Sequence, residues 1–158
     1  MILKSNRKAF SLLTALFVIV LMATVAMLVM NMTGKMVKET TTQYQREQAA
    51  LLAKSYTEYA IMAVTANDRT TNNCLSDIDG TVGSDPTNGN GYRIRARIAY
   101  IGHNAEVGSC PATRVFSSSV VEPNSPLNII VDVYVEYKEA DNTSAPWVTY
   151  HKRTLQKI

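Results

Sequence analysis

Residues 10–30 read FSLLTALFVIVLMATVAMLVM, which is a run of 21 residues without a charged side chain. A helix rises about 1.5 Å per residue, so this run is about 31 Å long as a helix, close to the thickness of the hydrocarbon core of a bilayer. A secretory signal peptide has a shorter apolar region that ends in small residues, whereas Met30 is followed by Asn31, Met32 and Thr33. The run therefore predicts a membrane-spanning helix.

The charge of the chain is concentrated before this run. The formal net charge is +3, and Lys4, Arg7 and Lys8 account for it, because residues 10–158 hold 13 basic and 13 acidic side chains. Basic residues that flank a span stay in the cytoplasm, so we expect everything after Met30 to lie on the far side of the membrane. A chain of 158 residues then leaves room for one small domain beyond the span.

The helical pattern continues past the span to about Ala66, since no proline occurs before Pro86. Residues 31–66 are predicted to be amphipathic, and Lys54 and Glu58 are spaced to pair on the polar side. Gly34 and the threonines at 40–42 are the weakest points of the predicted helix. The positions expected to form its apolar face are Leu52, Tyr56, Tyr59, Ala63 and Ala66.

The segment Lys8-Ala9-Phe10-Ser11-Leu12-Leu13-Thr14, together with the basic leader and the span, resembles the type IV prepilin family of pilus subunits and type II secretion pseudopilins. The resemblance implies that a prepilin peptidase cuts between Ala9 and Phe10 and that the new amino group is methylated. The family pattern has glycine at the position of Ala9 and glutamate at the position of Thr14. Thr14 therefore lacks the carboxylate that serves in subunit assembly, which implies a place at or near the filament tip.

The distal part of the chain is predicted to be a β domain. Residues 67–91 are rich in Asn, Asp, Thr and Gly and are expected to form a loop. Alternating apolar residues predict strands at 92–100 and 128–138, and further strands are expected at 113–121 and 147–156. The fold class is α+β, a pilin-like ladle in which the long helix packs on an antiparallel sheet of about four strands. Its parts are a leader (1–9), a span (10–30), an amphipathic half helix (31–66) and a β domain (67–158).

Asp77, Ile78 and Asp79 begin a short match to the first motif of haloacid-dehalogenase phosphatases, but the preceding residues are too polar for the buried strand that this chemistry requires. Asp77, Asp79 and Asp85 also offer oxygen ligands for calcium, although their spacing is not that of an EF-hand. We expect a polar surface loop here, with no catalytic residue, metal or cofactor. The calcium alternative stays open.

Cys74 and Cys110, with His103 and His151, are enough ligands for zinc by count, but they lack the short paired spacing of a zinc site. On the oxidising side of the membrane we expect a disulfide between the two cysteines, with buried free thiols as the alternative. Arg93, Arg95 and Arg97 share one strand face and are expected to pair with Asp132 and Glu136 rather than with nucleic acid.

These observations predict a non-enzymatic minor pilin or pseudopilin in the bacterial inner membrane, with its amino terminus in the cytoplasm and its β domain in the periplasm or in a surface filament. Its expected partners are the prepilin peptidase, other pilin or pseudopilin subunits and the membrane. The alternative is an uncleaved, single-span anchored periplasmic protein that binds a ligand.

Overall fold

The computed structural model of the chain describes residues 7–69, 73–120, 127–140 and 142–158, with side chains from residue 12 onward. One helix, α1 (Arg7–Ala66), runs without a break through the predicted span and the amphipathic half. The chain divides into two compact units, residues 1–42 and 43–158, and α1 contributes to both. The expected leader, residues 1–9, lies mostly outside the described residues.

The predicted weak points do not interrupt α1. The hydroxyls of Thr40, Thr41 and Thr42 donate to the carbonyls of Met36, Val37 and Lys38, at 2.8–2.9 Å. Each hydroxyl therefore finds an acceptor one turn back on its own helix. The three threonines remain exposed on a continuous helix rather than marking its end.

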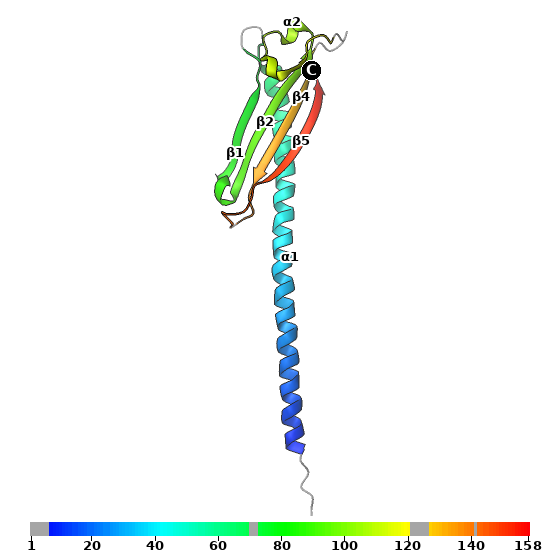
Figure 1. Cartoon of the computed structure of the whole chain (residues 1–158), viewed down its shortest axis with the longest axis vertical. Helices are drawn as coiled ribbons and strands as arrows, with labels where there is room; N and C mark the ends of the chain where they lie inside the picture. The colour runs from blue at the N-terminus through cyan, green and yellow to red at the C-terminus, as the bar shows by residue number, and fades with distance from the viewer. Residues whose placement is uncertain (1–6, 70–72, 121–126, 141) are drawn as a thin grey trace, which may run out of the picture. The chain divides into compact units, whose positions relative to one another are not determined.

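The second unit is an α+β domain in which residues 43–66 of α1 pack on a sheet. The long strands lie in the order β1 (Asp77–Asp85), β2 (Asn90–Gly102), β4 (Leu127–Tyr137) and β5 (Val148–Lys157), and each neighbouring pair is antiparallel. Figure 1 shows them side by side, with β1 and β5 at the two edges. A short fifth strand, β3 (Val115–Ser117), pairs with β2 in parallel. Short helical segments η1 (Pro86–Asn88), α2 (Asn104–Val107) and η2 (Ala112–Arg114) complete the described elements.

The strands predicted from alternation at 92–100 and 128–138 are confirmed, and the last strand is confirmed within one residue at each end. The loop predicted at 67–91 is wrong in part, because residues 77–85 form β1 and pair with β2 over most of their length. Glycine and aspartate hid this edge strand, whose only large apolar side chains are Ile78 and Val82. The strand expected at 113–121 is reduced to three residues and is parallel to β2.

The face of α1 that contacts the sheet differs from the predicted one by about one position. Tyr59 is 54% exposed, whereas Ala53 and Ala60 are fully buried. The apolar residues expected on this face are larger, but small side chains let the helix backbone approach the sheet. The buried positions of this helix face are Gln45, Ala49, Ala53, Thr57, Ala60 and Val64.

The opposing layer comes from alternate residues of β2 and β4, as predicted. They include Ile94, Ile98, Val131 and Val133, each with no exposed surface. Tyr100 is also buried, and its hydroxyl donates to the Leu75 carbonyl at 2.6 Å. Burial raises the pKa of Tyr100 to about 12, so the hydroxyl remains a donor at neutral pH.

The close contact between helix and sheet predicts that Ala53→Leu destabilises the domain. Overpacking a filled core costs about 1–3 kcal/mol, so the free energy of unfolding should fall by that amount. Urea unfolding of the full-length protein in mild detergent, followed by the fluorescence of Trp147, measures it. Ser55→Leu, at an exposed position of the same helix, is the matched control and should leave the free energy unchanged or slightly raised. Equal destabilisation by both variants would contradict this packing.

Candidate assembly surface and processing site

The largest apolar surface of the described chain lies on α1 between residues 12 and 37. Every described side chain from 12 to 44 is exposed, and the large apolar ones among residues 12–37 expose 51–77% of their surface. The helix contains a window long and apolar enough to cross a membrane, and none of that window is buried within the chain. An apolar surface of this size is stable only against lipid or against other apolar side chains.

A second exposed apolar surface lies on the domain part of α1, and the sequence analysis did not find it. We call it the outward row, and it consists of Tyr44, Leu51, Tyr59 and Met62, which are 54–64% exposed. At 100° per residue these four positions fall within a sector of about 80°, in which Tyr44, Leu51 and Met62 lie opposite Ala53 and Ala60 and Tyr59 lies at the flank. The signal was present as spacings of seven, eight and three residues. It was missed because these positions were assigned to the buried face or left unassigned.

The residues of the predicted processing site lie at the start of α1. The bond between Ala9 and Phe10 falls in the first turn of the helix, where helix ends fray. The side chains of Ala9 and Phe10 are outside the described residues. Thr14 is described and is exposed on the apolar helix.

Cys74 and Cys110 form a disulfide with their Cα atoms 4.8 Å apart, which confirms the predicted pairing. It joins the segment before β1 to the segment after α2, next to the core. The four candidate zinc ligands are therefore not assembled. His103 accepts a hydrogen bond from the Ala105 amide at the start of α2, and His151 lies 2.8 Å from Asp132.

Asp77 and Asp79 lie on edge strand β1 and contact arginines. Asp77 lies 2.6 Å from Arg114 and 3.2 Å from Arg97, and Arg97 also donates to Asp79 at 2.5 Å. The hydrogen bond from Arg97 holds the pKa of Asp79 below its usual value, so this carboxylate is ionised. Both aspartates lie on an edge strand, whereas the phosphatase motif places its aspartates directly after a buried strand.

The three aspartates considered as calcium ligands are not brought together at this strand. Asp85 accepts hydrogen bonds from the amides of Thr87 and Asn88 and so caps η1 instead of facing Asp77 and Asp79. Among the residues that the structure describes, no group of three acidic, histidine or cysteine side chains is placed to hold a metal ion.

Glu136 and Asp132 lie opposite the arginine stripe across β2 and β4, as predicted, and among the described ion pairs the stripe contacts Glu136. Both Arg93 and Arg95 contact the carboxylate of Glu136, which is almost buried. Arg97 turns to β1, and Asp132 instead accepts two hydrogen bonds from Arg153 on β5, at 2.7 and 2.8 Å. These bonds, together with the bond from His151, hold the pKa of Asp132 below its usual value. The ion pair between Asp132 and Arg153 was not predicted, because the prediction considered only the pairing of β2 with β4.

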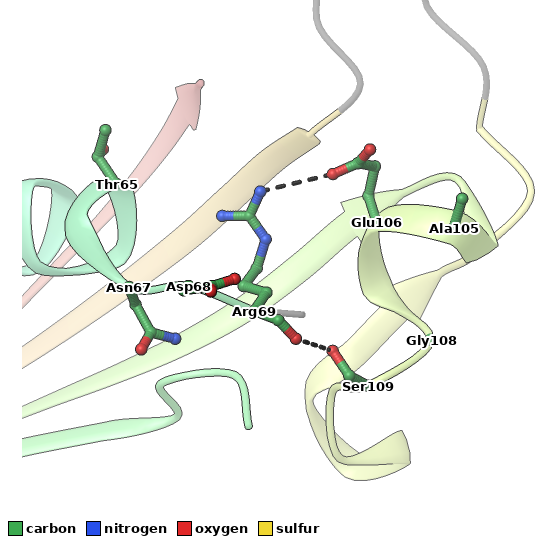
Figure 2. Close-up of a pocket in the computed structure, with 8 residues that line it drawn as sticks. All are labelled: Thr65, Asn67, Asp68, Arg69, Ala105, Glu106, Gly108 and Ser109. Atoms are coloured by element: carbon green, nitrogen blue, oxygen red, sulfur yellow. Dashed lines mark hydrogen bonds and ion pairs between the residues drawn. The ribbon is translucent and has the colours of Figure 1, made fainter. Parts of the chain in front are cut away.

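A pocket of about 440 Å³ lies beyond the end of α1, between Asn67–Arg69 and the α2 segment. Figure 2 shows the Arg69 guanidinium facing Glu106, 3.5 Å away, and the Arg69 carbonyl accepting a hydrogen bond from Ser109 at 2.8 Å. These contacts tie the end of α1 to the segment that carries Cys110. The polar groups of Arg69, Glu106 and Ser109 that line the pocket therefore contact one another.

Comparison of the chain with protein-family models, with curated proteins and with solved structures gives no match.

The disulfide predicts a measurable loss of stability in the double variant Cys74→Ser/Cys110→Ser. The two cysteines are 36 positions apart, and a cross-link over such a loop contributes about 3–4 kcal/mol in the chain-entropy model. Urea unfolding should show this loss, and the wild-type protein in reductant should match the variant. Thiol labelling of the denatured, unreduced wild type should find no free cysteine. Two labelled thiols per chain, or an unchanged unfolding midpoint, would contradict the prediction.

Proposed function

We propose that this chain is a minor pilin or pseudopilin, a structural subunit of a type IV pilus or of a type II secretion pseudopilus. The observation that carries the proposal is the exposed apolar surface of α1, which covers residues 12–37 and reappears in the domain as the outward row. Lipid accounts for the first part. The outward row is better covered by a protein neighbour than by lipid. The domain that carries it also has a charged sheet face, which keeps that domain in water.

The mechanism follows from these two surfaces. The apolar helix is held in the inner membrane, with the β domain in the periplasm, until assembly. During assembly the helix leaves the lipid and packs on the helices of neighbouring subunits, so one apolar contact replaces another. The outward row extends this helix packing into the domain. The cleavage before Phe10 and the methylation of the new amine are carried out by the prepilin peptidase, which is the expected processing partner.

Processing is the first test of this proposal. We expect the mature protein to begin at Phe10 with a methylated amine, since the basic leader, the small Ala9 and the apolar Phe10 fit the cut. Intact-mass measurement of the membrane-extracted protein decides it. Ala9→Gly should be cut at least as completely as wild type, and a bulky Ala9→Trp should block cutting. A wild-type protein that keeps residues 1–9 would favour the alternative, an anchored periplasmic binding protein that does not polymerise.

Thr14 supports a place at or near the tip. A charge at the centre of a membrane helix costs about 2.5–3.5 kcal/mol, so the family's glutamate persists only with a partner or a function. Threonine avoids this cost, because hydroxyls on this helix bond to carbonyls one turn back, as Thr33 does to Val29. It also cannot neutralise the amino terminus of a neighbouring subunit. A subunit with no neighbour ahead of it does not need that pairing.

This interpretation predicts where the protein lies in the filament. Immunogold labelling of sheared filaments should mark ends, with few labels along the shaft, and deletion of the protein should reduce filament number. Thr14→Glu restores the carboxylate and should increase labelling along the shaft, whereas the uncharged Thr14→Gln should not. Regular shaft labelling of the wild type would refute the tip position.

A further inference from the structure

The sheet of the domain has two free edges, and their charges are opposite. Strand β1 contains Asp77, Asp79 and Asp85 and no basic residue, which is a formal charge of −3. Strand β5 contains Lys152, Arg153 and Lys157 and no acidic residue, which is a formal charge of +3. In the sheet order each of these strands has one long neighbour, β2 for β1 and β4 for β5.

The direction of the strands lets the two edges pair. The four long strands alternate in direction, so β1 and β5 run in opposite directions. A second copy laid beside the first in the same orientation places its β1 antiparallel to the first copy's β5. Figure 1 shows this opposition in the two edge strands. Antiparallel pairing then continues from one sheet to the next without turning either copy over.

The charges across the outer face set the register. Asp77, Arg97, Asp132 and Arg153 are successive partners across β1, β2, β4 and β5, and their signs alternate. A second copy whose Asp77 lies opposite Arg153 continues this alternation, and the same register places its Asp79 opposite His151. Pairing of either edge with itself instead brings two strands of the same net charge side by side, which is unfavourable.

The edge groups are accessible for such pairing. The side chains of Asp79 and Arg153 are each 61% exposed, and that of Asp77 is 47% exposed. The pairing of β1 keeps one register from Asp77 to Gly83 and shifts only between Gly83 and Asp85. Seven residues of β1 are therefore regular enough to accept a new strand.

The helix side of β1 offers a place for Lys152. In the same register, Lys152 lies opposite Ile78 of the second copy. Ile78 borders a groove of about 400 Å³ that is also lined by Ser55, Tyr56, Tyr59 and Asp79. Tyrosine rings suit an ammonium group. An inward-pointing charge on an edge strand usually prevents another strand from pairing there. In the proposed contact, the groove of the second copy accommodates the ammonium group of Lys152.

We propose that the β5 edge of one copy pairs with the β1 edge of a second copy, so that their sheets join head to tail. This heterologous contact goes beyond the proposed function and rests only on its membrane anchoring, since copies held in one membrane in the same orientation can meet before any of them enters a filament.

The test uses Thr81→Cys and Thr149→Cys, which are exposed, lie on the outer face and are opposite each other in the proposed register. Full-length chains carrying one change each, with different tags, are expressed together and treated in membranes with a bis-maleimide. A linker of about 10 Å tolerates a shift of two residues, because a strand rises about 3.3 Å per residue. The native cysteines are oxidised and do not react.

The mixed chains should give roughly fivefold more cross-linked dimer than either variant alone, the factor expected for about 1 kcal/mol between opposite and like charges across strands. Lys152→Glu on the Thr149→Cys chain should remove this excess, and Lys152→Arg should keep it. Equal cross-linking of each variant with itself would overturn the proposal.

Leu51→Cys separates this proposal from the filament proposal, because Leu51 belongs to the outward row. Cross-linking through Leu51 without cross-linking between the edges would overturn the edge pairing and leave the filament subunit in place. Absence of both cross-links would overturn the edge pairing and leave a subunit whose filament neighbours are other proteins.

Discussion

The packing of small side chains of α1 against the sheet is the contact on which the domain depends. Ala49, Ala53 and Ala60 are fully buried, and they bring the helix backbone close to the apolar layer of β2 and β4. The buried Thr57 fits the same face because its hydroxyl donates to the Ala53 carbonyl at 2.7 Å. A polar atom is thereby satisfied without a partner from the sheet.

The close packing of α1 on the sheet constrains the outer face of the sheet and the sequence of strand β1. The sheet has one buried face, so its other face must be compatible with water, and ion pairs between neighbouring strands cover much of it. It also constrains β1. A Cβ atom at Gly80 would clash with the hydroxyl of Tyr56 on α1, which explains why a glycine lies in the middle of that strand. The same glycine weakens the strand signal in the sequence.

The sequence was a good guide where one period dominates. The uninterrupted helix and strands β2 and β4 follow from their periodicity, and the disulfide follows from the number of cysteines and from the compartment that the sequence predicts. Strand β1 could not be predicted, because its stability comes from pairing with β2 and not from its own propensity. The outward row was missed for a different reason. Tyr44, Leu51 and Met62 are apolar residues on a helix with a second apolar face, and periodicity alone does not say which face the sheet covers.

One small sheet cannot cover both faces of a helix that has apolar residues on two opposite sides. The sheet covers the face that carries Ala53 and Ala60, and nothing in the described part of the chain covers Leu51 or Met62. Both side chains lie in the unit that holds the sheet, where they are 61% and 64% exposed. Lipid can cover residues 12–37, but it does not reach an ionic β domain in water. On the proposed function, helices of neighbouring subunits cover these domain side chains, which anchoring in lipid alone does not do.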